Sequence, residues 1–166
     1  VKGINIEAND SSVTNNAVLS NKEGTGILGR NTEIINYGNL QIEKGTGISA
    51  LSNSLLTNSA EINVTAEGTG IKASNSEINN ENNGTITVTK GINIDLSESV
   101  LENAALLSNL DGVGIKADNS IVKNTGNKDI KNGTAIEDLN NSSILNTAYL
   151  KSGNTVINTS NSILLN

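Results

Sequence analysis

The sequence predicts an all-β fold: a right-handed parallel β-helix of about eight turns, with 20–23 residues and three short strands in each turn. Three observations support this prediction. Two motifs recur along all 166 residues with a period near 22. Inside each repeat, aliphatic residues alternate with polar ones, which is the periodicity of a strand. Gly and Asn separate these segments, and both tolerate the backbone conformations of tight turns.

The first motif is Ser/Thr-x-aliphatic-x-Asn, which occurs eight times at intervals of 20–23 residues. Its hydroxyl residues are Ser11, Thr32, Ser54, Ser76, Ser99, Ser120, Ser142 and Ser162, and its asparagines are Asn15, Asn36, Asn58, Asn80, Asn103, Asn124, Asn146 and Asn166. Side chains at equivalent positions of stacked turns lie over one another. We therefore expect a structural ladder of asparagine amides, each bonded to the next, and a second column of hydroxyls beside it.

The second motif is Gly-x-Gly-Ile, found at 24–27, 45–48, 68–71 and 112–115, with weaker forms at 3–4, 91–92 and 135–136. Aligned on these aliphatic residues, the repeats alternate between steps of 23 and 21, which indicates a paired unit of 44 residues. The same alignment predicts one outward-facing column, made of Asn5, Leu28, Ser49, Lys72, Asn93, Lys116 and Glu137.

In one repeat we expect three strands in order, around 62–64, around 70–73 and around 76–80. β-Branched residues suit these strands, and the density of Gly and Asn disfavours a helix. The leucine-rich pattern and the six-residue beat of left-handed hexapeptide helices are both absent. We expect a single β-helix segment over residues 1–166, cut from a longer chain, because the sequence has no Met and ends within its repeat.

The amino-acid composition excludes several classes of functional site and partner. The chain has no His and no Cys, which excludes Ser-His-Asp and Cys-His triads, thiol chemistry, disulfides and the usual zinc sites. Its formal net charge of −6 disfavours nucleic acid as a partner, and no apolar run is long enough for a membrane helix. Tyr37 and Tyr149 are the only aromatic residues. We expect no cofactor, no metal and no catalytic residue.

Three groups of residues are candidate sites. Glu23, Glu67 and Asp111 share a column, about 9–10 Å apart on alternate turns, and carboxylates at such spacings cleave polysaccharides in inverting glycosidases. Lys44 falls between two of them, which instead favours charge neutralisation on a solvated edge. Calcium would need a repeated acidic motif, whereas Asp111 and Asp118 are isolated.

Interfaces favour Tyr and Arg, so the sequence suggests a partner-contact patch made of Leu28, Arg30 and Tyr37. Lys128 is a different anomaly, because it occupies a position that aliphatic residues hold in other repeats. A lone buried lysine is costly, so we expect a local register shift or a loop there.

Three segments carry a resemblance to a known family: Asn-Tyr-Gly-Asn-Leu-Gln-Ile at 36–42, Glu-Gly-Thr-Gly-Ile-Lys at 67–72 and Asn-Ser-Ile-Val-Lys-Asn at 119–124. The chain resembles the passenger domains of large type V autotransporter adhesins, in particular the fusobacterial RadD-like family. The resemblance implies export to the outer membrane and cell surface, or release from it, and a role in virulence. It implies a protein or glycan receptor on host cells or partner bacteria, and a monomeric chain. Membrane attachment would come only from a C-terminal β-barrel translocator outside this sequence.

Three functions therefore remain open. The first is an adhesin segment that mediates or supports attachment, and the second is an inert stalk that presents a distal binding domain. The third, which the sequence favours least, is a polysaccharide-active β-helix enzyme. The near absence of insertions favours a stalk-like role for this segment within an adhesive whole.

Overall fold

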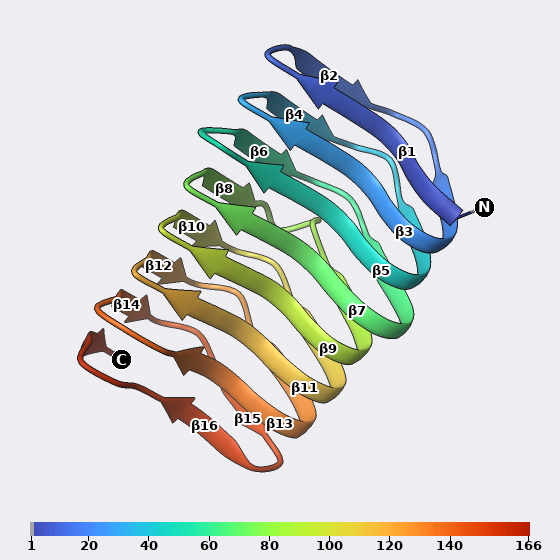
Figure 1. Cartoon of the computed structure of the whole chain (residues 1–166). Coiled ribbons are helices and arrows are strands. Elements are labelled where there is room, and N and C mark those ends of the chain that lie inside the picture. Colours follow the sequence, from blue (N-terminus) through green and yellow to red (C-terminus); the bar gives the residue numbers. More distant parts are fainter. Residues whose placement is uncertain (1) are drawn as a thin grey trace.

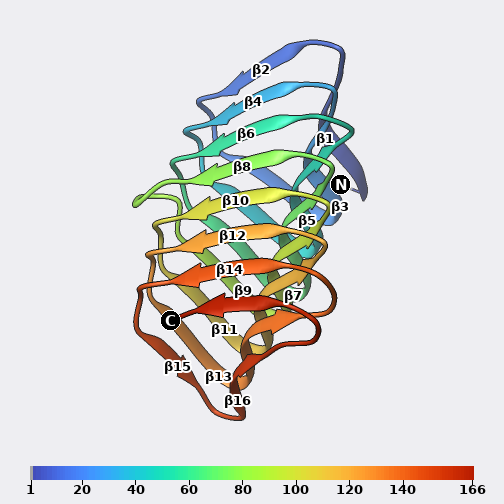
Figure 2. The same ribbon diagram turned by 90° about the vertical axis from the view of Figure 1, so that its left-hand side faces the viewer.

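In the computed structural model, which describes residues 2–166, parallel strands stack into a β-solenoid of about eight turns, a right-handed parallel β-helix (Figure 1). The turns form two sheets that run the length of the stack, one of long strands and one of short strands, with the apolar core between them (Figure 2). The predicted fold class is confirmed.

The first sheet follows the order β1-β3-β5-β7-β9-β11-β13-β15, and β16 also pairs with β13. Its strands are β1 (Lys2–Asn9), β3 (Leu19–Arg30), β5 (Leu40–Leu51), β7 (Ile62–Ser74), β9 (Ile86–Ser97), β11 (Leu107–Asp118), β13 (Lys128–Asp138), β15 (Leu150–Ser152) and β16 (Thr155–Asn158). The second sheet holds β2 (Ser12–Asn15), β4 (Glu33–Asn36), β6 (Leu55–Asn58), β8 (Glu77–Asn80), β10 (Val100–Asn103), β12 (Ile121–Asn124), β14 (Ser143–Asn146) and β17 (Ile163–Leu165).

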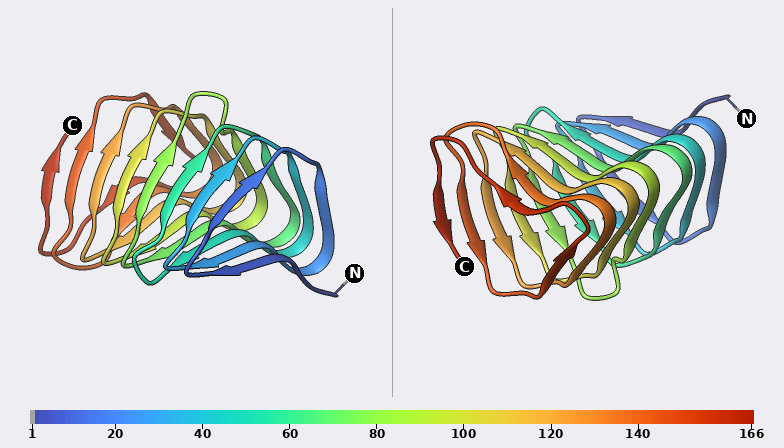
Figure 3. Two further views of the ribbon diagram at one scale, coloured as in Figure 1. Left: turned by 90° about the horizontal axis from the view of Figure 1, so that it is seen from above. Right: turned by 90° about the horizontal axis from the view of Figure 1, so that it is seen from below.

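The first two strands predicted for each repeat are one continuous, bent strand. Most of the long strands bend at the first glycine of the Gly-x-Gly motif, and Figure 3 shows the bends stacked along one side of the molecule. At the bend, Gly24 and Gly45 have φ near +130°, a conformation that residues with a Cβ rarely adopt. A Cβ on Gly45 would also lie 2.0 Å from the carbonyl oxygen of Gly24 in the preceding turn. Glycine therefore lets the strand turn without leaving the hydrogen-bonded ladder.

The strand register corrects the alignment of the weaker motif copies. Ile27 pairs with Ile6, not Ile4, and Ile115 pairs with Ile94, not Ile92. The reason is that Gly3 and Gly91 occupy the bend itself and stack on the first glycine of their neighbours. The steps are then 21, 21, 23, 23, 21 and 21, so the 44-residue pairing does not hold. The true column is Glu7, Leu28, Ser49, Lys72, Asp95, Lys116 and Glu137, whereas Asn93 is buried.

The correct register shows a longer repeat of four turns, 88 residues in length. Residues 3–64 align with residues 91–152 without a gap, and we call these the first and second modules. Each module opens with the same amide pair, which is partly buried in the first module and buried in the second. The Nδ2 of Asn21 donates to Oδ1 of Asn5 at 2.9 Å, and the Nδ2 of Asn109 donates to Oδ1 of Asn93 at 3.1 Å. Because equivalent positions share one framework, differences between the modules mark side chains that the fold does not require.

Candidate functional site

The asparagine ladder runs through the corner at which each short strand ends. Amide Nδ2 of each member donates to Oδ1 of the member in the next turn, over distances of 2.6–2.8 Å, from Asn15 to Asn166 without a break. The second Nδ2 hydrogen often caps the same corner, as in the 3.0 Å bonds from Asn58 to the Ala60 carbonyl and from Asn103 to the Ala105 carbonyl. From Asn15 to Asn146 the side chains are buried. The hydrogen-bond partners of the ladder side chains lie within the chain itself, so the ladder is a structural element.

The hydroxyl column occupies the opposite corner and stabilises it in two directions. The backbone N–H of Ser54 donates to the hydroxyl of Ser76 in the next turn at 3.2 Å, and that hydroxyl donates to the Ser74 carbonyl at 2.9 Å. The residue before the hydroxyl is left-handed, for example Asn75 at φ 48°. Asparagine tolerates this conformation, which explains the recurring Asn-Ser pair. This column is also structural.

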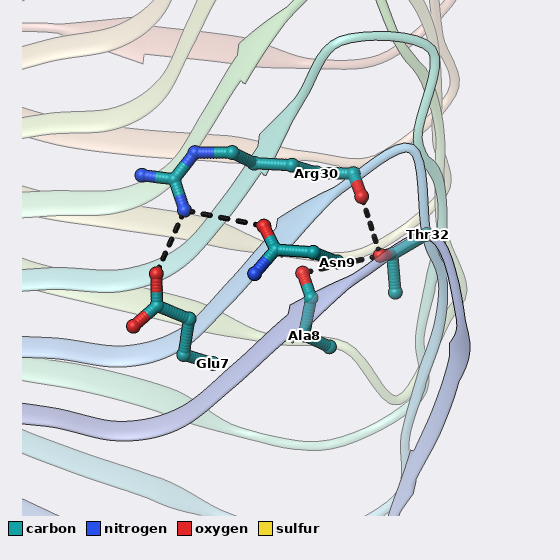
Figure 4. Close-up of polar contacts among 5 residues, drawn as sticks. All are labelled: Glu7, Ala8, Asn9, Arg30 and Thr32. Atoms are coloured by element: carbon teal, nitrogen blue, oxygen red, sulfur yellow. Dashed lines mark hydrogen bonds and ion pairs between the residues drawn. The ribbon is translucent and has the colours of Figure 1, made fainter.

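Leu28, Arg30 and Tyr37 do not form the predicted contact patch. Leu28 is only 7% exposed, because the neighbouring turns cover it. The guanidinium of Arg30 forms a 2.9 Å ion pair with Glu7 in the preceding turn, as Figure 4 shows. Tyr37 is exposed but follows β4, which separates it from Arg30. The prediction that these three residues form one patch is therefore wrong.

The acidic column alternates in charge along the stack. Glu23 pairs with Lys44, and Lys90 stands between Glu67 and Asp111. Every carboxylate therefore has a cationic residue in the adjacent turn, which favours a charge-neutralised edge over a pair of catalytic carboxylates. Among residues 2–166, no group of His, Cys, Asp or Glu is arranged to hold a metal ion.

The hollows of the surface are open and are lined by both polar and apolar side-chain surface. One of about 530 Å³ lies beside the bulge in β7 and is lined by residues that include Lys22, Gln41, Glu43 and Thr65. A second, of about 340 Å³, adjoins the loop at 81–84, which interrupts the smooth outline of the stack (Figure 2). Neither hollow has an aromatic residue on which a sugar ring could stack.

A group of exposed aliphatic residues, which the sequence reasoning missed, lies on the outer face of the short-strand sheet. Val100, Ile121 and Leu145, on β10, β12 and β14, are 40%, 57% and 40% exposed. Val100 pairs directly with Ile121, whereas Leu145 on the next strand pairs with Lys123 and so lies diagonally from Ile121. We call these three residues the outer apolar patch. The signal was present in the sequence, since they occupy the outward positions of the Ser/Thr-x-aliphatic-x-Asn motif.

The two modules differ at the outer apolar patch. Ser12, Glu33 and Thr57 hold the equivalent positions in the first module. The fold therefore does not require an aliphatic residue at these positions. An exposed group of this kind is typical of a protein interaction site.

Lys128 lies in the core, without the predicted register shift or loop. It pairs in register with Leu107 and Leu150, and it is 1% exposed. Its Nζ donates to Oδ1 of Asn124 at 2.5 Å, so the asparagine ladder provides a hydrogen-bond partner for the buried amine. Burial holds the pKa of Lys128 well below its usual value of 10.5.

Asp138 is a second charged residue in the core that the sequence reasoning missed. It pairs with Ala117, and its side chain is 2% exposed. Its column is otherwise made of small or aliphatic residues, such as Ala50 and Ala73. Asp138 lies outside both sequence motifs, so only the strand register identifies its position as part of the core.

Among residues 2–166 there is no helix long and apolar enough to cross a membrane. Comparison of the chain with family models, with curated proteins and with solved structures gave no match.

Proposed function

We propose that this chain is a β-helical segment of an exported bacterial surface protein, of the autotransporter passenger type, and that it contributes to attachment. The observation that carries the proposal is the outer apolar patch. Val100, Ile121 and Leu145 expose aliphatic surface on a stack whose core is already filled by other residues. A partner that covers such surface gains free energy of binding, because apolar area is removed from water.

The chemistry of the patch favours a protein receptor over a glycan. Sugar recognition relies on aromatic rings that stack on the sugar, and neither tyrosine belongs to the patch. Two of the nearby charges are paired, because Lys123 and Glu102 form an ion pair at 3.2 Å between β12 and β10, and Glu77, which pairs with Val100, lies at the edge of the patch. Aliphatic side chains bordered by charged ones suit an apolar area with a polar rim on a protein of host cells or of partner bacteria.

Export is supported by the composition and by the way the stack is built. A chain without Cys forms no disulfide that would obstruct its passage through a pore. Each turn pairs mainly with its immediate neighbours, so a stack can fold progressively as turns emerge.

A stalk is the second candidate function, and the divergence between the modules favours it. The ladder positions and most core positions keep their residue type from the first module to the second, whereas outward positions change, as in Leu28 to Lys116 and Arg30 to Asp118. A stalk needs the framework and places few demands on its outer face. The enzyme is the weakest candidate, because its carboxylates alternate with lysines.

Attachment of the purified chain to host cells and to partner bacteria tests the proposal. The variant V100S/I121E/L145T gives the second module the residues that the first module carries at the same positions, so the fold tolerates them. We expect it to lose most of the attachment of the unaltered chain. The control L110K replaces an exposed aliphatic residue on the long-strand sheet with the residue of the first module and should leave attachment unchanged.

The alternatives give different results in the same assay. Failure of the unaltered chain to attach to any cell would favour the stalk, and equal attachment by the triple variant would rule out the patch. Release of soluble products from polysaccharides would establish the enzyme.

A further inference from the structure

Two core residues of the second module differ in kind from their equivalents in the first module. Where the first module has Leu40 and Ala50 facing the core, the second has Lys128 and Asp138. Other core positions of the same strand stay aliphatic, as at Ile130 and Ile136. Both substitutions therefore fall in a single turn, which consists of β13 and β14.

Asp138 is buried without compensation. Its two carboxylate oxygens have no hydrogen-bond partner among residues 2–166. The equivalent position in an earlier turn is Gly29, where a Cβ would point at the Ile34 side chain, 2.6 Å away. The Asp138 side chain thus projects towards the aliphatic column of the short-strand sheet, which Ile144 occupies at this level. An unpaired carboxylate in such surroundings is strongly unfavourable.

Lys128 is only partly compensated. The hydrogen bond from its Nζ goes to Oδ1 of Asn124, an oxygen that already accepts a 2.8 Å hydrogen bond from Asn103. Its neighbours in the column are Leu107 and Leu150, which offer no polar group. Lys128 and Asp138 are the first and last residues of β13, and the lysine binds the asparagine ladder rather than the carboxylate.

The turn that follows covers β13 incompletely. β11 pairs with β13 over nearly its whole length, whereas on the other side two short strands, β15 and β16, replace one long strand. Val156 of β16 is 45% exposed. The β13–β14 turn thus has two buried charges within it and a poor contact beyond it.

We propose that the β13–β14 turn is an opening point built into the stack, at which it and the residues after it separate from β11 and β12 as one unit. In a solenoid, stability is close to a sum of the stability of each turn and of its contacts with its neighbours. Two unfavourable core residues in one turn therefore lower the free energy of opening there specifically. Opening exposes the backbone N–H and C=O groups of β11 and β12, an edge to which another strand can pair.

Hydrogen exchange measured by mass spectrometry tests this opening in the full chain. The β3–β4 turn is the control, since it lies one turn in from the other end of the stack. Fraying of the ends alone predicts similar exchange in the two turns. The proposal predicts that amides of β13 and β14 exchange roughly 10–100-fold faster than those of β3 and β4. Equal exchange in the two turns would overturn it.

The variant K128L/D138A assigns the cause, because it restores the two residues of the first module on a framework known to accept them. Exchange in β13 and β14 should slow to the rate of β3 and β4. Unchanged exchange in this variant would show that the charges do not create the opening point, and would overturn the proposal.

Tryptic cleavage after Lys128 is a second readout, because this buried residue is accessible to the protease only when its turn opens. The D138A variant keeps the cleavage site and should be cut roughly tenfold or more slowly after Lys128. Cleavage of the denatured chains provides the control for the intrinsic rate. Equal rates in the native chains would contradict the proposal.

Discussion

Replacing Asn80 with alanine removes one member from the middle of the asparagine ladder. Its Nδ2 donates to Oδ1 of Asn103 at 2.7 Å, and its Oδ1 accepts from Nδ2 of Asn58 at 2.8 Å. All three side chains are at most 1% exposed, so water does not replace the lost bonds. Asn58 keeps its second bond, to the Ala60 carbonyl, whereas Oδ1 of Asn103 loses its ladder donor.

The loss in free energy of unfolding follows from these contacts. A buried polar atom left without a partner costs about 1–3 kcal/mol, and the second broken bond together with the small cavity adds roughly 1 kcal/mol. We expect Asn80→Ala to lower the free energy of unfolding by about 2–4 kcal/mol. For a chain of this size that is a fall of roughly 4–16 °C in Tm.

Thermal unfolding followed by far-UV circular dichroism measures this effect. Asn79→Ala is the matched control, because Asn79 is the exposed neighbour on the same strand, and it should change Tm by less than about 2 °C. If both variants melt at the same temperature, the ladder does not stabilise the stack and the reasoning fails.

Three further predictions concern the bend, the buried lysine and the exposed ion pair. Gly45→Ala should cost roughly 2–4 kcal/mol, because φ is 129° and the new Cβ would strike the preceding turn. Gly3→Ala, at φ 131° with nothing within 4 Å, should cost only ~1 kcal/mol; equal costs in chemical denaturation would exclude the close approach as the cause. The pKa of Lys128 is lower in the folded chain than the unfolded value of 10.5, so the folded state binds fewer protons and stability should rise with pH between the two values. Denaturation midpoints of Lys128→Leu should lack that rise, and a parallel pH profile would contradict it. Arg30→Ala breaks a solvent-exposed pair with Glu7 and should change stability by less than ~1 kcal/mol in the same assay, a prediction that a larger loss would refute.

The asparagine and hydroxyl columns could be predicted from the sequence because each recurs once per turn. Stacked strands place equivalent positions over one another, so the period alone identifies which side chains meet. The eight copies from Asn15 to Asn166 therefore define the ladder. The same reasoning failed for Leu28, since exposure depends on how the side chains of the adjacent turns cover it.

The sequence is compatible with two registers of the long strands. Gly3 can be aligned with either glycine of a Gly-x-Gly motif, because both alignments bring an isoleucine near the expected place. The hydrogen-bonded ladder decides between the two alignments, because Gly3 pairs with Gly24 and both glycines have positive φ at the bend. That choice in turn fixes the 88-residue module and places Asn93 inside the stack rather than outside it.

The sequence by itself determined the parallel β-helix, its number of turns and its two polar ladders, because those properties depend on periodicity. Only the tertiary structure decided which glycine makes the bend, which aliphatic residues remain exposed, and that Lys128 and Asp138 share the core of one turn. The physical reason is that the repeat tolerates a substitution at any single position. Whether that substitution is buried, paired or exposed depends on its neighbours in the turns before and after, about 22 residues away in the chain.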